Sequence, residues 1–341
     1  MVLYAAMAQP IESVARPPGA WHSLEPPPRE VQPLPGDVSP RRYFRVVLDD
    51  GVTAILANYP EEVRAVCPRF LRTTGLLTAA GVRVPRVLAG DCDEGWMLVE
   101  DLGPRTLGEW GRGRPWSEVE GYFERALEIL RRVSSLPADE VAALNPTLGR
   151  ELLSRELAQT WEFFLEPRGL VSDPALAADL RAALDTLCAS LGDEPAVPCH
   201  RDFMVRNLMP LPDGGLVVLD HQDLRLGPPL YDLASLLNDT LFPPAAAEEA
   251  LLAKVAASDD ARRSYHRAAA QRCLKAVGTF AKFAHLGADR HVPLIAPTLA
   301  RFVKHFSQIP EGTALAAELR EAWSPALETP GPAGSVTLGT L

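Results

Sequence analysis

The stretch that decides the fold is "CHRDFMVRNLMPLPDGGLVVLDHQD", residues 199–223. It places Asp202 five residues before Asn207 and ends the apolar segment "LVVLD" on Asp220. The "PDGG" between the two apolar segments is a turn signal, so the segments are expected to form two short strands. The loop before the first strand and the end of the second strand then converge on one point. The sequence therefore brings an Asp, an Asn and an Asp together.

This set of side chains suits phosphoryl transfer. That reaction needs a carboxylate that orients the attacking hydroxyl, and oxygen ligands that hold Mg²⁺ on the nucleotide phosphates. Mg²⁺ prefers oxygen donors and takes one or two carboxylates from a protein. Taken singly, Asp220 could be a strand-end turn residue and Asn207 could cap a turn. Taken together and in this order, the residues favour a catalytic base at Asp202 and an amide and a carboxylate ligand at Asn207 and Asp220.

The same residues carry a family resemblance. "HRDFMVRN" has the spacing of the protein-kinase catalytic loop, and "LDHQDLRLGPPLYDLASLL" resembles the aminoglycoside-phosphotransferase branch of the protein-kinase-like phosphotransferases. Four further segments resemble the bacterial anomeric kinases of N-acetylmuramate and N-acetylglucosamine, which serve cell-wall recycling: "SPRRYFRV", "GVRVPRVLAGD", "MLVEDLG" and "QRCLKAVGTFAKFAHL". The resemblance covers about residues 30 to 310. It implies that Asp202 orients a sugar hydroxyl and that Asn207 and Asp220 bind Mg²⁺.

The expected fold is α+β and protein-kinase-like, with two lobes. A small antiparallel-sheet N-lobe and a larger helical C-lobe would bind ATP and Mg²⁺ between them. The chain divides into a flexible Pro-rich leader, a nucleotide-binding N-lobe, a catalytic and acceptor-binding C-lobe and a disordered tail, at residues 1–28, 29–102, 103–325 and 326–341.

Local patterns agree with this division. Three strands are predicted between residues 30 and 59, with "DDG" as a hairpin turn, and a helix over 61–80 ends at Gly81. "RVPRVLAGD" and "GWMLVED" predict two more strands. Beyond "EDLG" the apolar residues repeat with a helical period, which predicts helices around 119–133, 147–165 and 174–191 and from Leu233 to about Trp323.

Four residues near the catalytic loop are expected to support it. Asp232 in "YDLASLL" would brace the loop from the start of a helix, although a plain N-cap is a compatible alternative. His200 and Arg201 are expected to position the loop rather than to react. Asp223 is expected to be a hydrogen-bond partner behind the metal site rather than a ligand.

The expected nucleotide site departs from the protein-kinase pattern. The first 253 residues contain no lysine, and Ala57 and Asn58 stand about where protein kinases keep the lysine that pairs with the phosphates. The candidate phosphate loop, "LPGDVSPRR", has a single glycine. Another cation must therefore neutralise the phosphates, or the protein is a weak catalyst.

Arg41 and Arg42, beside Ser39, are the candidates for that cation, because arginine binds phosphate bidentately. On a strand the two side chains point to opposite faces, so one of them reaches the nucleotide. We favour Arg42, and the alternative is that both arginines are solvent-exposed.

For the adenine, "MLVEDLG" resembles a hinge in which the backbone of Glu100 and Leu102 binds the base edge. An ordinary connector is the alternative for this segment. No "G-x-x-x-x-G-K-[ST]" motif occurs in the sequence, which excludes a P-loop kinase.

The acceptor is indicated by charge. Residues 262–290 carry one acid, Asp289, and seven basic residues: Arg262, Arg263, Arg267, Arg272, Lys275, Lys282 and Arg290. A basic acceptor region disfavours an aminoglycoside or choline and tolerates a neutral or carboxylated sugar. The alternative is a solvated helix face. Gly278 within this predicted helix costs about 1 kcal/mol relative to Ala, which indicates close packing or substrate approach there.

Composition bounds the remaining possibilities. The net charge of −10 gives no reason to expect nucleic acid or an anionic membrane as partner. No apolar run could span a bilayer, and the first ten residues do not resemble a signal peptide. The five cysteines show no C-x-x-C spacing, so we expect reduced thiols in a cytoplasmic protein.

The sequence thus predicts an ATP- and Mg²⁺-dependent sugar kinase. Two rivals stay open: a kinase of another small molecule (aminoglycoside or choline-like) or of protein, and a nucleotide-binding scaffold with little catalysis. The missing lysine suggests the scaffold, and the intact Asp202, Asn207 and Asp220 argue against it. The oligomeric state is not indicated.

Overall fold

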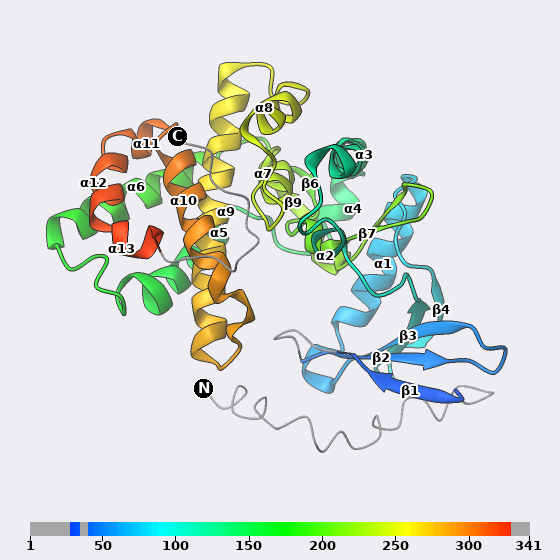
Figure 1. The fold of residues 1–341 in the computed structure, drawn as a ribbon. Helices are drawn as coiled ribbons and strands as arrows, with labels where there is room; N and C mark the ends of the chain where they lie inside the picture. Colours follow the sequence, from blue (N-terminus) through cyan, green and yellow to red (C-terminus); the bar gives the residue numbers. More distant parts are fainter. Residues whose placement is uncertain (1–27, 35–39, 329–341) are drawn as a thin grey trace. The chain divides into compact units, whose positions relative to one another are not determined.

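The computed structural model describes residues 28–34 and 40–328, and divides into two compact units (Figure 1). The sheet unit contains the described residues up to Ala79 together with Arg83–Pro104. The helical unit contains Ala80–Val82 and the chain from Arg105 onward. The expected α+β fold class, with a small antiparallel sheet and a larger helical part, is confirmed. The expected leader, except residue 28, and the expected tail from residue 329 lie outside the described residues.

The helical unit is built around one long helix, α9 (Asp259–His285), drawn in yellow to orange in Figure 1. Its first turn is capped by the Ser258 side chain, which accepts from the Ala261 N–H, and carries two acids that complement the helix dipole. The other helices of the unit are α2 Leu107–Trp110, α3 Trp116–Ser134, α4 Ala138–Ala142, α5 Arg150–Thr160, α6 Pro174–Gly192, α7 Tyr231–Leu237, α8 Ala245–Ala253, α10 Ile295–Phe306, α11 Pro310–Thr313, α12 Ala316–Ala322 and α13 Ser324–Leu327. Helices α5, α6, α7 and α10 pack on α9.

Gly278 lies where α9 passes close to Thr160 at the end of α5. A Cβ at Gly278 would lie 2.6 Å from the Thr160 Cα, and the Thr160 hydroxyl donates to the Leu274 carbonyl at 2.7 Å. The expected close packing at this glycine is therefore confirmed. The helix predicted over 147–165 begins later, at Arg150, and its last five residues form a π-helical turn, Trp161–Leu165.

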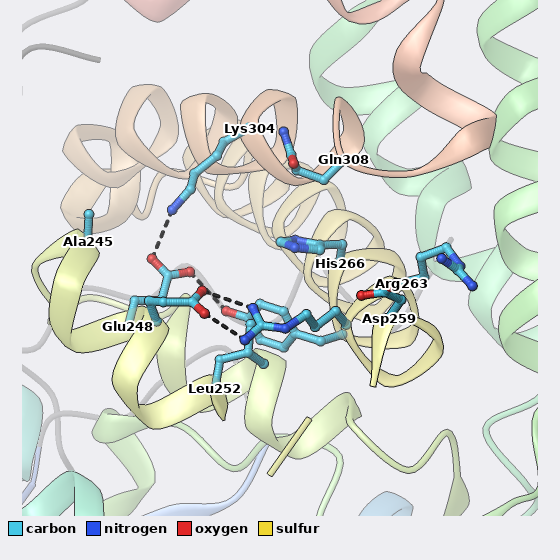
Figure 2. A pocket seen from close by; sticks show the side chains of 11 residues that line it. Ala245, Glu248, Leu252, Asp259, Arg263, His266, Lys304 and Gln308 are labelled. Carbon is cyan, nitrogen blue, oxygen red and sulfur yellow. Dashed lines mark hydrogen bonds and ion pairs between the residues drawn. The ribbon is translucent and has the colours of Figure 1, made fainter. Parts of the chain in front are cut away.

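The first half of α9 is fixed by a buried acid of α8. The Glu248 carboxylate accepts hydrogen bonds from Arg301 at 2.8 Å, from Lys304 at 2.9 Å and from the Tyr265 hydroxyl at 3.0 Å. Glu248, Tyr265 and Lys304 border an open hollow of about 540 Å³ between α8, α9 and α10, where Figure 2 shows Lys304 reaching Glu248. None of the residues expected at the catalytic site lines this hollow.

Two small sheets carry the segment from 197 to 227. Strands β7 (Leu208–Pro210) and β8 (Leu216–Val218) form the expected hairpin. Gly214 takes a φ of +81° in its turn, and Asp213 accepts the Gly215 N–H. The pairing of β6 (Val197–Cys199) with β9 (Arg225–Gly227) was not expected, and it ties the two ends of the segment together.

The sheet unit holds a five-stranded antiparallel sheet of order β1-β2-β3-β5-β4. Its strands are β1 Glu30–Pro33, β2 Arg42–Val47, β3 Thr53–Asn58, β4 Val87–Asp91 and β5 Trp96–Glu100. A 3₁₀ turn, Glu61–Val63, precedes the helix α1 (Val66–Ala79), and Gly81 follows it with a φ of +71°. The expected strands and helix are thus present.

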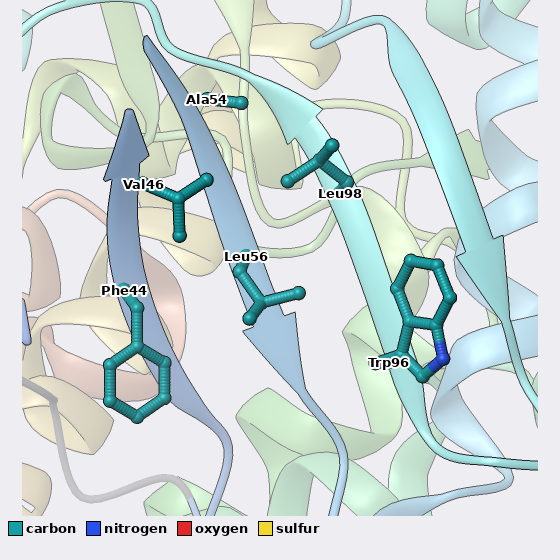
Figure 3. Packing of buried hydrophobic residues seen from close by; sticks show 6 residues of the cluster. All are labelled: Phe44, Val46, Ala54, Leu56, Trp96 and Leu98. Atoms are coloured by element: carbon teal, nitrogen blue, oxygen red, sulfur yellow. The ribbon is translucent and has the colours of Figure 1, made fainter. Parts of the chain in front are cut away.

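The two faces of this sheet follow the strand period of two. One face carries a buried apolar cluster, shown in Figure 3, of Phe44, Val46, Ala54, Leu56, Trp96 and Leu98. The opposite face packs on α1 through Tyr43, Ala57 and Met97. Arg42 pairs with Asn58 across the strands and lies on the face of Phe44 and Leu56, whereas Arg41 lies over the Tyr43 ring.

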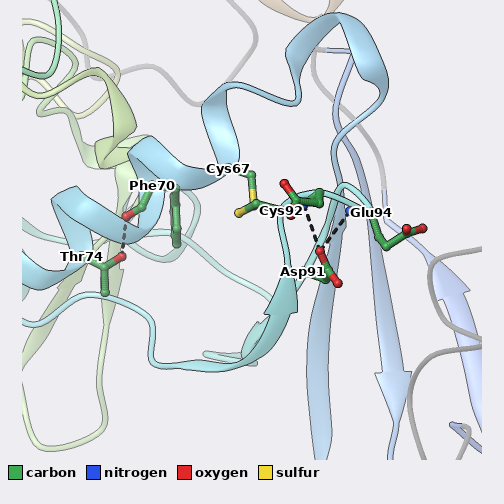
Figure 4. Close-up of a disulfide and its surroundings, with 7 residues drawn as sticks. Cys67, Phe70, Thr74, Asp91, Cys92 and Glu94 are labelled. Atoms are coloured by element: carbon green, nitrogen blue, oxygen red, sulfur yellow. Dashed lines mark hydrogen bonds between the residues drawn. A yellow bond between two sulfur atoms is a disulfide. The ribbon is translucent and has the colours of Figure 1, made fainter.

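A disulfide joins Cys67 of α1 to Cys92, which follows β4 (Figure 4). The expectation of reduced thiols was therefore wrong for these two cysteines. They are 25 residues apart in sequence and meet because α1 packs on the β4–β5 hairpin, which no local spacing reveals. Cys188, Cys199 and Cys273 are free and buried, and burial raises the pKa of the Cys188 thiol to about 11.

Over residues 28–34 and 40–328, no helix is both long enough and apolar enough to cross a bilayer.

Candidate active site

The catalytic loop leaves β6 and is held by Asp232. The Asp232 carboxylate accepts the backbone N–H of His200 at 2.6 Å and that of Arg201 at 2.8 Å. Arg201 takes a φ of +77°, an uncommon conformation for a residue with a side chain. Asp232 does not cap α7, because the N-cap position is Leu230 and no side chain caps that helix. Burial raises the pKa of Asp232 to about 6 despite the two N–H donors.

Asn207 links the loop to the hairpin. Its side-chain amide donates to the Asp202 carbonyl at 2.8 Å, and its own carbonyl accepts the Leu219 N–H at 2.8 Å. Asp220 comes next along the chain, with a φ of +55°, and its Oδ1 accepts the Gln222 amide at 2.8 Å. Asp202, Asn207 and Asp220 are thus brought together at one end of the β7–β8 hairpin.

His200 is fully buried beneath this hairpin. Its Nε2 lies 2.9 Å from the Leu219 carbonyl, which can only accept, so Nε2 carries the proton. The ring meets Phe203 edge-on, with 5.8 Å between the ring centroids. These contacts fix the loop against the second strand and leave His200 remote from solvent.

Five charged side chains form what we call the catalytic-loop cluster: Asp202, Glu156, Arg201, Arg272 and Lys275. Arg272 Nη2 and Lys275 Nζ each lie 3.4 Å from Asp202 Oδ1. Arg201 donates to Glu156 Oε1 at 2.6 Å, and Lys275 lies 3.5 Å from the same oxygen. The sequence analysis did not identify Glu156, and it named Arg272 and Lys275 only among the seven basic residues of 262–290. The signal that could have singled out Arg272 and Lys275 is their spacing of three residues on a predicted helix, which places them on one face.

The cluster holds its carboxylates ionised. Burial by itself raises the pKa of Asp202, but Lys275, Arg272 and Arg201 outweigh it, so the pKa lies well below the usual value. Burial likewise opposes Lys275 and Arg201 at Glu156, and the cations again lower the pKa. At Lys275, burial outweighs the two carboxylates and lowers the pKa of the ammonium.

Asp223 lies behind this cluster. Its carboxylate pairs with Arg201 at 3.4 Å and with Arg225 at 3.1 Å. Asp223 therefore joins the two arginines from the end of the 3₁₀ turn His221–Asp223, which follows Asp220 directly. The neighbouring His221 is buried, and burial lowers its pKa to about 3, so it stays neutral.

The donor set at the hairpin suits a hard cation. Asn207 and Asp220 offer an amide and a carboxylate, which are the oxygen ligands that Mg²⁺ takes beside substrate phosphates. Within the described residues no group of three or more His, Cys, Asp or Glu side chains could hold a metal ion by itself. A cation held by Asn207 and Asp220 would take its remaining ligands from water or substrate phosphates.

The residues expected to hold the nucleotide belong to the sheet unit. Arg42 is exposed at the start of β2, and Ser39 lies outside the described residues. The Glu100 carboxylate pairs with Arg83 at 2.6 Å, and its backbone N–H donates to the Arg86 carbonyl. Leu102 follows in the connector after β5.

A small antiparallel sheet with one packed helix, and a helical unit that carries a His-Arg-Asp loop, define the protein-kinase-like class of fold. Solved structures agree: an aminoglycoside phosphotransferase APH(4)-Ia mutant, in a ternary complex with ADP and hygromycin B, superposes with a TM-score of 0.56. It is 15% identical in sequence, and the match covers 83% of this chain and 95% of that chain.

The family follows from sequence comparison. The model of the phosphotransferase enzyme family matches residues 30–270, and the chain belongs to that family. An N-acetylmuramate/N-acetylglucosamine kinase of Pseudomonas aeruginosa is 32% identical over 275 residues, covering 76% of this chain and 79% of that protein. A protein of the same name from Neisseria meningitidis is 30% identical over 300 residues, covering 80% and 83%.

Proposed function

We propose that this protein is a kinase that transfers the γ-phosphoryl group of ATP to the anomeric hydroxyl of N-acetylmuramate or N-acetylglucosamine. The observation that carries the proposal is the catalytic loop, in which Asp202 stands beside Asn207 and Asp220 in a chain of the phosphotransferase family. Relatives that match about three quarters of the chain are named as kinases of these two sugars. The activity would serve the recovery of cell-wall sugars.

Asp202 orients the acceptor hydroxyl in this proposal. Phosphoryl transfer needs little covalent chemistry from the protein, so a carboxylate of low pKa suffices when it holds the hydroxyl in line. Asp232 fixes the loop backbone, and Asn207 fixes the Asp202 carbonyl, which together set the direction of the carboxylate. Asn207 and Asp220 would hold Mg²⁺, which neutralises charge on the nucleotide phosphates when bound.

The sheet unit supplies the groups for ATP. Arg42 lies on the face of the apolar cluster, away from α1, and is the cation we assign to the phosphates. Because the Glu100 N–H is already paired with Arg86, we assign its carbonyl and the Leu102 N–H to the adenine edge. A nucleotide complex of a solved structure with this fold supports the use of ATP.

The charges of α9 favour an uncharged or acidic sugar. Arg262, Arg263 and Arg267 lie in the first part of the helix, and each forms an ion pair with an acid. Their positive charges are therefore balanced locally. Arg272 and Lys275, in contrast, reach Asp202 itself. An acceptor hydroxyl bound at Asp202 therefore lies beside cations, which disfavours aminoglycosides and choline.

An acceptor panel tests the proposal. The purified protein is incubated with ATP, Mg²⁺ and N-acetylmuramate, N-acetylglucosamine, their methyl glycosides, kanamycin or choline, and ADP release is measured. We expect turnover of the free sugars, none of the methyl glycosides and little of the cations. Robust turnover of a methyl glycoside would overturn the anomeric assignment, and robust turnover of a polycation would overturn the sugar assignment.

We also propose a cytoplasmic location, because the reaction consumes ATP. Disulfides are rare in reducing compartments, and the structure pairs Cys67 with Cys92, so this location needs a test that does not depend on the thiols. Fractionation of cells, followed by immunoblotting for the protein, should find it in the cytoplasmic fraction. Recovery of the protein from the cell envelope or the medium would contradict the location.

A further inference from the structure

Two cations of α9 converge on a single oxygen of the Asp202 carboxylate. Arg272 Nη2 and Lys275 Nζ each lie 3.4 Å from Oδ1, while Arg201 Nε lies 4.0 Å from Oδ2. Residues three apart leave a helix on the same face, so this meeting is built into α9. Oδ2 is thereby left as the oxygen that faces an acceptor hydroxyl.

The Lys275 ammonium is held in place from behind. Glu156 lies 3.5 Å from it and is itself fixed by Arg201 at 2.6 Å. The contact between Gly278 and Thr160 sets the distance between α9 and α5, which carry Lys275 and Glu156. Only 11% of the Lys275 side chain is exposed. The ammonium is therefore preorganised, unlike that of a surface lysine.

The cluster is open at the reacting carboxylate. The Asp202 side chain is 22% exposed, whereas that of Glu156 is 5% exposed. A hydroxyl that binds to the exposed part of Asp202 therefore also lies close to the Lys275 ammonium, which is 3.4 Å from Asp202 Oδ1. The phosphoryl group in transit carries negative charge on its three equatorial oxygens. A fixed cation at this place stabilises that charge more than a solvated one does.

The other three lysines of the chain are engaged elsewhere. The first 253 residues contain no lysine, so the sheet unit can supply only arginine. Of the four lysines, Lys254 pairs with Glu124, Lys304 with Glu248, and Lys282 donates to Gln159. Lys275 alone among the four contacts the catalytic carboxylate.

Resting on the proposed kinase function, we propose that Lys275 is a catalytic residue of the transfer, with Arg272 as its positioning partner. The two hold Asp202 through Oδ1, and the ammonium binds the phosphoryl group as it moves. The acceptor oxygen forms a bond to the γ-phosphorus, and the bond from that phosphorus to the β,γ-bridging oxygen breaks. ADP leaves with that electron pair, and the hydroxyl proton passes to Asp202 Oδ2 and on to solvent.

Paired methionine variants test this role. Lys275→Met removes the charge and keeps most of the volume, and Lys304→Met is the matched control in the Glu248 ion pairs. We expect kcat of Lys275→Met to fall about 10²-fold or more, with the KM for ATP and for the sugar nearly unchanged. Lys304→Met should keep the wild-type kcat. Equal kcat in Lys275→Met and the wild type, at equal fraction folded, would overturn the proposal.

Charge rescue separates catalysis from a structural role. Lys275→Arg should recover part of kcat, and methylammonium added to Lys275→Ala should raise kcat in a saturable way. A structural defect would respond to neither. The loss must also be shared by both sugars. If only the KM for N-acetylmuramate rose and N-acetylglucosamine were unaffected, Lys275 would instead bind the acceptor carboxylate, and the proposal would be wrong.

A binding measurement keeps the inference independent of the acceptor. Nitrate is a planar anion that mimics the phosphoryl group in transit, so it should tighten Mg²⁺-ADP binding to the wild type in calorimetry and not to Lys275→Met. Slow ATP hydrolysis without sugar gives a second reading, since water replaces the hydroxyl. Absence of sugar turnover with Lys275-dependent hydrolysis would reject the proposed function and keep the role of Lys275. Sugar turnover that is unaffected by Lys275→Met, with no effect of nitrate on Mg²⁺-ADP binding, would keep the proposed function and reject the role of Lys275.

Discussion

Helix α9 helps to form two clusters of buried charge in the helical unit, one around Asp202 and one around Glu248. In the catalytic-loop cluster, Asp202 has its two closest cations at 3.4 Å and is 22% exposed. In the other, Glu248 receives Arg301 and Lys304 at 2.8 and 2.9 Å and is 6% exposed. In both clusters, two or more cations surround one carboxylate. They differ in how completely the carboxylate is satisfied.

This difference separates a structural ion pair from a reactive one. Four hydrogen bonds saturate the Glu248 oxygens, from Tyr265, from Lys304 and two from Arg301, and leave nothing to offer a ligand. The cations near Asp202 stand too far for strong hydrogen bonds, so the carboxylate keeps capacity for a hydroxyl. We therefore expect mutations in the first cluster to change rate and mutations in the second to change stability.

The largest effect should come from Asp202→Asn. The amide cannot accept or orient the hydroxyl proton as the carboxylate does, so kcat should fall about 10³-fold, within the range for loss of a general base. Mg²⁺-ATP binding, measured by calorimetry, should persist, because Asp202 acts on the acceptor. Loss of ATP binding together with turnover would place Asp202 on the nucleotide instead.

Asp220→Asn should have the next largest effect on turnover. The amide is a poorer Mg²⁺ ligand than a carboxylate, so we expect kcat to fall about 10²-fold or more and the Mg²⁺ concentration for half-maximal rate to rise. The fold should survive, because the Asp220 contact to Gln222 can be kept by an amide oxygen. Wild-type activity in this variant would remove Asp220 from the metal site.

Glu248→Gln should break the other cluster and leave kcat unchanged. An unpaired buried Arg301 costs about 3 kcal/mol of unfolding free energy, which denaturant titration measures. The pKa of Glu248 is lowered in the folded state, since Arg301 and Lys304 outweigh burial. Its contribution is therefore present above pH 4.5, the ordinary value, and is lost as the pH falls below it. The stability gap between wild type and variant should close in acid, and a gap that stayed constant would contradict the ion-pair account.

The sequence predicted the set of Asp202, Asn207 and Asp220 but not the ion pairs around Asp202. Asp202 and Asn207 precede β7 and Asp220 follows β8, so their meeting follows from local spacing along one hairpin. Glu156 lies on α5, and its contact with Lys275 depends on how two helices pack, which no spacing along the chain states. The seven basic residues of 262–290 looked alike in sequence, yet Arg262 pairs with Glu249 at the surface while Arg272 turns to Asp202.

The contrast between local spacing and tertiary packing also explains why the strand prediction was confirmed and the cysteine prediction was wrong. A strand period of two is a local property, and it correctly separated the faces of Arg41 and Arg42. The Cys67–Cys92 bond joins a helix to a hairpin that packs on it, so it needed tertiary structure to be seen.

The smallest effect on activity is expected in the sheet unit. There, two arginines of β2 repeat the comparison between a saturated ion pair and an open charge. Arg45 makes a tight pair with Asp101, at 2.7 Å, whereas Arg42 is exposed on the face of the apolar cluster. If open cations serve the substrate and saturated ones serve the fold, Arg42→Ala should raise the KM for ATP about fivefold to tenfold, the loss of one exposed charge-assisted contact of about 1 kcal/mol. Arg41→Ala, on the opposite face, should change it less than twofold, and Arg45→Ala should lower the melting temperature first. Steady-state kinetics at saturating sugar, with thermal unfolding of each variant, measure these effects.

Equal and negligible effects of Arg42→Ala and Arg41→Ala on the KM for ATP would contradict this prediction. The phosphates would then rely on backbone amides and Mg²⁺. The distinction between open and saturated cations would hold only within the helical unit.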